Sequence, residues 1–129
     1  FSLKHLVINE KVRNFAGEVK SQSMMKKERI LDAIKNVAHS DIPRGARVIL
    51  YGSQARGDSH KGSDWDLLIL IDKNKLSPCD YDIYSYPFWE LGWNIDAMIH
   101  PTLYTFKDWE RKTNPIFRAN VERDGIELC

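Results

Sequence analysis

The stretch from Tyr51 to Asp66 constrains the fold most, because it joins two apolar, strand-like runs through a polar connection that contains several glycines. The run 48–51 leads into this connection and the run 67–71 leads out of it. Polar residues held between two buried strands are typical of a site built at strand ends.

The first part of the connection has the features of a phosphate-binding turn. Gly52 lets the backbone approach an anion closely, and the free N–H groups at a helix start attract phosphate. Ser53 can open a short helix and either cap it or donate its hydroxyl to a phosphate oxygen. Arg56 is expected one turn along on the same side, where its guanidinium can bind phosphate through two nitrogens.

The connection ends with two acids, Asp64 and Asp66, whose spacing points both carboxylates to one face of a strand while Trp65 faces the other way. Two carboxylates this close repel each other unless a cation lies between them. Oxygen ligands suit Mg²⁺, which also binds substrate phosphates. The pattern predicts two Mg²⁺ ions arranged for in-line displacement at phosphorus. The alternative is that both acids are ordinary turn residues and Ser53 is an ordinary helix cap.

This run of residues resembles the nucleotidyltransferase superfamily that includes DNA polymerase beta and kanamycin nucleotidyltransferase. More narrowly, it is similar to the small bacterial minimal nucleotidyltransferases. The resemblance is specific over residues 48–71, is weaker from there to the C-terminus, and does not cover residues 1–23. The residues that carry it are Gly52, Ser53, Arg56, Gly57, Ser63, Asp64, Asp66 and Leu67.

The resemblance implies an enzyme that transfers a nucleoside monophosphate from an NTP, with ATP as the first choice, to an acceptor hydroxyl and releases pyrophosphate. In such enzymes the Gly-Ser pair holds the triphosphate and the paired acids bind the metals. The expected phosphate-binding residues are then Gly52, Ser53, Arg56 and Ser63, and the expected catalytic metal ligands are Asp64 and Asp66.

A third carboxylate, which acts in this family as base or metal ligand, is expected on a later strand. Residues 94–100 are predicted to be that strand, and Asp96 is its only acid. An acid inside an apolar strand is costly unless it has a partner. Asp96 is therefore the candidate for the third catalytic and metal-binding group, and the alternative is an edge-strand acid that faces water. His100 lies four residues beyond Asp96, on the same face of this predicted strand, and is interpreted as structural; a supporting role beside the site is the alternative.

The acceptor is expected to come from another chain. Only residues 101–129 follow the third predicted strand, too few for the helical acceptor-binding domain of antibiotic nucleotidyltransferases. Members of the minimal family pair with a helical HEPN-type protein in toxin–antitoxin modules, so the leading hypothesis is an antitoxin that modifies such a partner. The alternatives are an antibiotic-type enzyme acting on a small molecule, and a weak or inactive binding module with this fold. A homo-oligomer is left open.

Charge and cysteine content narrow the class of partner and the compartment. The net charge of +1 gives no broad basic field, so nucleic acid is not an expected partner. Cys79 and Cys129 match no zinc or redox spacing, which indicates free thiols in a reducing cytoplasm. No apolar run approaches the length of a membrane span.

The predicted architecture is α/β (α+β), with a small mixed β-sheet and helices packed on one face. Residues 24–129 are predicted to be the nucleotidyltransferase domain, and residues 1–23 an N-terminal extension, either added or upstream sequence, compatible with an amphipathic helix. The aromatic stretch 79–93 is interpreted as a helix that packs on the sheet, with Pro87 breaking or kinking it; a base-stacking surface is the alternative. The other predicted elements are helices at 25–39, within 102–112 and at 114–124, and strands at 46–51, 66–71 and 126–128. The helix within 102–112 is expected to be capped near Thr105, and the helix at 114–124 to be capped by Asn114 and stopped by Gly125.

Overall fold

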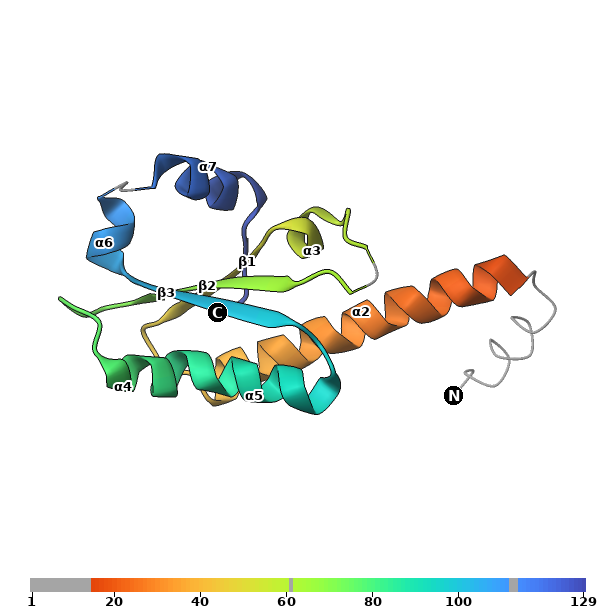
Figure 1. Ribbon diagram of the computed structural model, residues 1–129, viewed down its shortest axis with the longest axis horizontal. Helices are drawn as coiled ribbons and strands as arrows, with labels where there is room; N and C mark the ends of the chain where they lie inside the picture. Colours follow the sequence, from red (N-terminus) through yellow and green to blue (C-terminus); the bar gives the residue numbers. More distant parts are fainter. Residues whose placement is uncertain (1–14, 61, 112–113) are drawn as a thin grey trace. The chain divides into compact units, whose positions relative to one another are not determined.

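The computed structural model describes residues 15–60, 62–111 and 114–129 (Figure 1). The chain divides into two units, residues 1–32 and 33–129. In the first unit, the described residues form the N-terminal part of helix α2 (Phe15–Ser40), which starts ten residues before the predicted 25–39 helix and continues into the second unit. The predicted boundary at 23/24 falls inside α2 and stays a prediction, and part of the predicted extension lies outside the described residues.

A four-stranded mixed sheet is the centre of the second unit, as predicted. Its strands lie in the order β3-β2-β1-β4, with β1 antiparallel to β2 and β4, and β2 parallel to β3. The register places Asp66 opposite Tyr51 on one side and beside His100 on the other. The strands are β1 (Arg47–Tyr51), β2 (Trp65–Ile71), β3 (Ile99–Thr105) and β4 (Ile126–Glu127).

Helices cover both faces of this sheet rather than the one face that was expected. Leu68 and Leu70 of β2 pack with Val121 of α7 (Pro115–Asp124), and Leu67 and Ile69, which point to the opposite face, are also fully buried. In Figure 1, α6 (Phe106–Glu110) and α7 lie over one face, and α4 (Pro78–Asp80) and α5 (Tyr86–Ile95) lie along the other. A strand that is apolar on both sides needs cover on both.

The last helices begin at the residues that the sequence indicated. Thr105 caps α6, because its Oγ1 accepts a hydrogen bond from Asp108 N at 3.0 Å. Asn114 caps α7 in the same way, its Oδ1 accepting from Phe117 N at 3.3 Å, and α7 ends at Gly125. No helix in the described part of the chain is long and apolar enough to cross a membrane.

The aromatic stretch forms one helical run of three segments: α4, the π-helical segment η1 (Tyr81–Ser85) and α5. Pro87 lies in the first turn of α5, directly after the π-helical segment, and the helical run continues through it. Phe88 is fully buried, but Trp89 and Trp93 are 40% and 70% exposed. The helix is confirmed, whereas packing against the interior holds for Phe88 and not for these two tryptophans.

The third strand begins later than predicted. Helix α5 runs to Ile95, Asp96 ends it in a left-handed conformation with φ 54°, and β3 starts only at Ile99. The prediction of strand over 94–100 is therefore wrong, because the helix extends across its first residues. β3 stands at the end of the sheet order, a position that tolerates Pro101, which has no N–H to donate.

Candidate active site

The turn after β1 packs directly against an acid of β2. Gly52 has φ 79° and ψ −161°, a conformation that is essentially restricted to glycine, and the chain then enters the short helix α3 (Ser53–Arg56). A Cβ built at position 52 would lie 2.6 Å from Asp66 Oδ2. The backbone of the Gly-Ser turn and the Asp66 carboxylate are thus in contact, as the pairing of Tyr51 with Asp66 requires.

Ser53 occupies the first position of α3 and is half-buried. Its carbonyl oxygen accepts hydrogen bonds from the N–H groups of Gly57 (3.0 Å) and Asp58 (3.2 Å), which close the turn. Its hydroxyl has no hydrogen-bond partner among the residues that the structure describes. Beside Asp66, this leaves a hydroxyl that can serve a ligand.

The guanidinium of Arg56 forms ion pairs with two carboxylates. Its Nε lies 3.1 Å from Asp58 Oδ2 and its Nη1 lies 3.2 Å from Asp124 Oδ2 at the end of α7. Arg123 and then Arg56, through their hydrogen bonds, lower the pKa of Asp124 to about 2. The contacts show that Arg56 links α3 to α7, and its predicted phosphate contact stays a prediction.

Ser63 closes the loop that leads to the acids. Its Oγ accepts a hydrogen bond from His60 N at 2.7 Å, and its carbonyl oxygen accepts one from Gln54 Nε2 at 3.2 Å. The first bond closes the loop, and the second ties the residues just before β2 to α3. Ser63 thus supports the position of Asp64, and its predicted contact with phosphate stays a prediction.

Asp64 and Asp66 flank the buried Trp65, as the alternating pattern predicted. Asp64 is half-exposed, and its Oδ2 lies 3.3 Å from His100 Nε2. Burial, and then the charge of Asp64, raise the pKa of Asp66, while His100 acts in the opposite direction. This carboxylate pair has one imidazole as its neighbour, and it retains oxygen ligands that a divalent cation can use.

The predicted third acid does not lie on the strand beside this pair. Asp96 is exposed in the connection between α5 and β3, two residues before Met98, whose carbonyl oxygen accepts a hydrogen bond from Trp65 N at 2.7 Å. The residue beside Asp66 in the parallel register is His100. Among the described residues, no group of three or more His, Cys, Asp or Glu side chains could hold a metal ion.

His100 is the site residue whose position beside the acid pair the sequence pattern did not predict. Its spacing from Asp96 was visible, but its contact with Asp64 depends on the parallel register between β2 and β3. That register follows from where α5 ends, which the sequence pattern placed too early.

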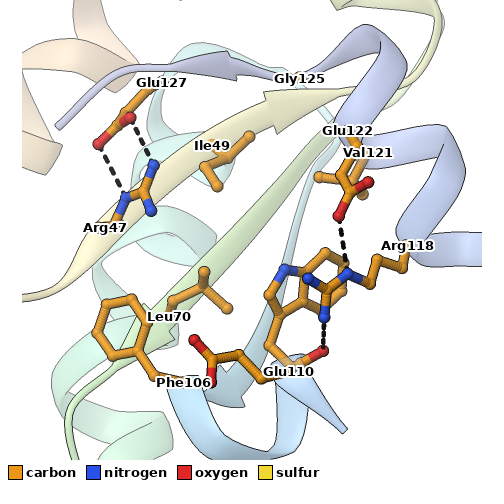
Figure 2. A pocket seen from close by; sticks show the side chains of 11 residues that line it. Arg47, Ile49, Leu70, Phe106, Glu110, Arg118, Val121, Glu122, Gly125 and Glu127 are labelled. Carbon is orange, nitrogen blue, oxygen red and sulfur yellow. Dashed lines mark hydrogen bonds and ion pairs between the residues drawn. The ribbon is translucent and has the colours of Figure 1, made fainter. Parts of the chain in front are cut away.

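A cavity of about 360 Å³ lies away from the acids, between the sheet and helices α6 and α7 (Figure 2). Apolar side chains of β1, β2 and α7 form part of its wall. Four of its charged side chains form ion pairs: Arg47 with Glu127 at 2.6 Å and Arg118 with Glu122 at 2.7 Å. It contains none of the predicted site residues, so we assign it no part in the chemistry.

A second cavity, of about 260 Å³, opens beside the acids. We call it the α5–β3 groove. It meets the acid pair through His100, which lines the groove and contacts Asp64. The residues that line it are Trp89, Gly92, Trp93, Ala97, Met98, Ile99 and His100.

Fold and site together define a class of protein: an α/β domain that sets a glycine–serine turn against paired strand-end carboxylates. The chain belongs to the nucleotidyltransferase domain family, whose sequence profile matches residues 25–122. Comparison with curated proteins gives no significant match.

Two solved structures share the fold. One is a toxin–antitoxin complex with AMP-PNP, with a TM-score of 0.53 and 20% identity over 76% of this chain and 71% of that chain. The other is a mutant of the toxin–antitoxin MntA–HpeT, with a TM-score of 0.53 and 19% identity over 76% of this chain and 70% of that chain. At this identity they confirm the nucleotidyltransferase fold.

Proposed function

We propose that this nucleotidyltransferase moves a nucleoside monophosphate from ATP to a hydroxyl of a protein acceptor. The acceptor oxygen bonds to the α-phosphorus, the bond from that phosphorus to the bridging oxygen breaks, pyrophosphate leaves and the hydroxyl proton passes to a base. Family membership supplies the reaction class. The contact between Gly52 and Asp66 carries the assignment to this site, because it sets the phosphate-binding turn against a metal-binding acid.

Ser53 and the turn around it bind the β- and γ-phosphates in this proposal, and Asp64 and Asp66 hold the metal. Mg²⁺ is usually bound by one or two carboxylates together with substrate phosphates, which fits a site with two acids beside an unpartnered hydroxyl. When bound, Mg²⁺ supplies positive charge to the transferring phosphoryl group. The chain itself then contributes position and electrostatic complementarity.

Asp96 is proposed to position or deprotonate the acceptor oxygen. It is the only non-glycine residue in the described ranges with a positive φ, and such conformations cluster at active sites. The connection that carries it is hydrogen-bonded to β2 between the two acids, through Trp65 N and Met98 O.

The acceptor is proposed to be a helical protein of the HEPN type, with this chain as its antitoxin. The two solved structures described above are toxin–antitoxin complexes, and one of them contains AMP-PNP, an ATP analogue. That pairing supports a protein acceptor over a small molecule and ATP over other nucleotides.

A second candidate function is a binding module that holds nucleotide and partner without transfer. The observation that favours it is that a histidine, His100, lies beside Asp66 on the neighbouring strand, and that no three-acid metal centre occurs among the described residues.

The test measures transfer of the labelled AMP group, from ATP labelled at its α-phosphate and in the presence of Mg²⁺, to the protein encoded by the reading frame next to the one for this chain. We expect labelling by the wild type, a loss of at least ~10²-fold in Asp66→Asn, and no loss in Asp41→Asn, an exposed acid outside the site. Saturating Mg²⁺ and ATP, at about 100 times the dissociation constant, should stabilise the wild type by about 2.7 kcal/mol. If wild type and Asp66→Asn bind the partner alike and neither transfers, the binding module is the correct function.

A further inference from the structure

Helix α5 presents an uncovered aromatic face next to the acids. Tyr86, Trp89 and Trp93 follow each other at spacings of three and four residues, which places them on one side of the helix. They are 43%, 40% and 70% exposed, and the rings of Tyr86 and Trp93 meet edge to face at 5.9 Å. Exposed clusters of this kind mark interaction sites, and tryptophan is enriched among residues that dominate binding energy.

This aromatic face is continuous with the α5–β3 groove, which Trp89 and Trp93 line on one side and Met98 and His100 on the other. Met98 is 59% exposed. Because His100 Nε2 lies 3.3 Å from Asp64 Oδ2, the groove leads from the aromatic face to the acid pair.

The order of the strands separates the two sides of the reacting centre. The Gly-Ser turn follows β1, the acids lie at the start of β2, and the groove begins on β3. In an in-line displacement, the attacking oxygen and the leaving pyrophosphate lie on opposite sides of the phosphorus. With the leaving phosphates at Ser53 on the β1 side, the acceptor hydroxyl enters from the β3 side, where the groove opens.

The charge around the groove selects the kind of acceptor. No Lys or Arg occurs between Lys75 and Lys107. Asp82, Glu90 and Asp96 in this stretch are exposed, and none of them forms an ion pair with a described residue. A surface that is apolar and negative repels nucleic acid and complements a polypeptide with apolar and basic side chains.

We propose that the α5–β3 groove docks the segment of the polypeptide acceptor that flanks the modified hydroxyl, through apolar side chains in the groove and Lys or Arg against the surrounding acids. This inference rests on the proposed transfer reaction and assigns the acceptor side of the same site. Trp93 and Trp89 are the anchoring residues on this chain.

Peptide titration tests the docking step without catalysis. The probes are two ten-residue peptides with a central hydroxyl residue flanked by leucines, one carrying lysines at its ends and the other glutamates. We expect the lysine peptide to shift the indole N–H signals of Trp89 and Trp93 in NMR spectra saturably, while Trp65 and Trp109 stay unchanged. The glutamate peptide should bind at least ~10-fold more weakly. Equal binding of both peptides, a response at Trp109, or no response at Trp89 and Trp93 would overturn the proposal.

Variants separate this proposal from the reaction itself. Trp93→Ala should weaken binding of the lysine peptide by ~10-fold or more. In the assay with α-labelled ATP, it should raise the KM for the protein acceptor and leave the KM for ATP unchanged. The matched control is Ile116→Ala, an equally exposed apolar side chain on α7, which should change neither. Asp66→Asn should abolish transfer and keep the indole shifts.

The outcomes assign a failure to one proposal or the other. Indole shifts without any transfer by the wild type would contradict the proposed transfer reaction and support docking in the α5–β3 groove. Transfer with an unchanged acceptor KM in Trp93→Ala would contradict docking in the α5–β3 groove and support the proposed transfer reaction. Concentration-dependent dimerisation that disappears in Trp93→Ala, measured by analytical ultracentrifugation, would show that a second copy of the chain covers this face and would also overturn the proposal.

Discussion

At the scale of single residues, position 52 has the least freedom in the site. Gly52→Ala would place a methyl group 2.6 Å from Asp66 Oδ2 and a side chain on a backbone with φ 79°. We expect the free energy of unfolding to fall by about 1–3 kcal/mol from backbone strain. We also expect NMP transfer to fall by ~10²-fold or more, because the Asp66 carboxylate must move. Urea denaturation and labelled-ATP transfer measure the two effects.

Gly57→Ala is the matched control for that substitution. Gly57 also has a positive φ, 84°, but no atom lies within 4 Å of a Cβ built there. The variant should lose about 1–2 kcal/mol of stability and keep its transfer activity. An equal loss of transfer in both variants would show that strain, rather than contact with Asp66, explains the effect.

Asp96→Asn tests the third acid. Asn tolerates the left-handed conformation as well as Asp does, so the substitution removes the charge without changing backbone strain. We expect stability to change by less than about 0.5 kcal/mol and transfer to fall by ~10²-fold. If Asp96→Asn is fully active and His100→Ala is not, His100 is the third functional group beside Asp64 and Asp66. The β2–β3 register, which places His100 next to Asp66, favours that assignment.

Local spacing was enough to predict that the Gly-Ser turn and the paired acids lie together. Gly52, Ser53, Asp64 and Asp66 lie within fifteen residues of one another, and short connections between paired strands bring such residues together. The ion pair between Arg56 and Asp124 joins residues 68 positions apart, so no local pattern could reveal it.

At the scale of elements, the Arg56–Asp124 ion pair joins α3 to α7, and we expect its contribution to stability to depend on pH. The folded-state pKa of Asp124 is about 2, below its ordinary value of 3.8, so its ionised form stabilises the fold. That stabilisation is complete above about pH 5 and is lost progressively as the pH falls towards 2. Asp124→Asn should therefore be less stable than the wild type at pH 6, with a difference that shrinks towards pH 2 in urea denaturation.

Asp58→Asn is the control for this acid dependence. Asp58 contacts the same guanidinium, but its side chain is 62% exposed, compared with 7% for Asp124. The variant should follow the wild type across the same pH range. A pH-independent gap between wild type and Asp124→Asn would show that packing at the end of α7 matters rather than charge.

Capping residues made the C-terminal elements predictable, because Thr105, Asn114 and Gly125 fix where α6 and α7 begin and end. The α5–β3 connection was not predictable in the same way. Apolar residues at 93, 95 and 99 alternate as in a strand. The structure instead continues helix α5 to Ile95 and ends it with the left-handed turn at Asp96. The exposed tryptophans of α5 were misassigned because aromatic content alone does not separate a core face from an uncovered one.

At the scale of the whole molecule, the boundary at 23/24 can be tested by a chain that starts at Met24. The family profile begins at residue 25, and the buried residues Ile34 and Ala38 of α2 lie in the second unit. We expect this shorter chain to keep its transfer activity and a thermal midpoint within ~3 °C of the full chain, which corresponds to less than about 1 kcal/mol. A drop of ~10 °C or more would place residues 1–23 inside the domain.

The position of Pro101 has a consequence for how other chains can associate with this one. β3 and β4 end the described sheet, and an incoming strand would need a continuous row of backbone donors and acceptors at one of them. Pro101 interrupts that row on β3, and β4 has only two residues. Both ends therefore resist β-augmentation and edge-to-edge aggregation, which leaves side-chain surfaces as the means of recognition.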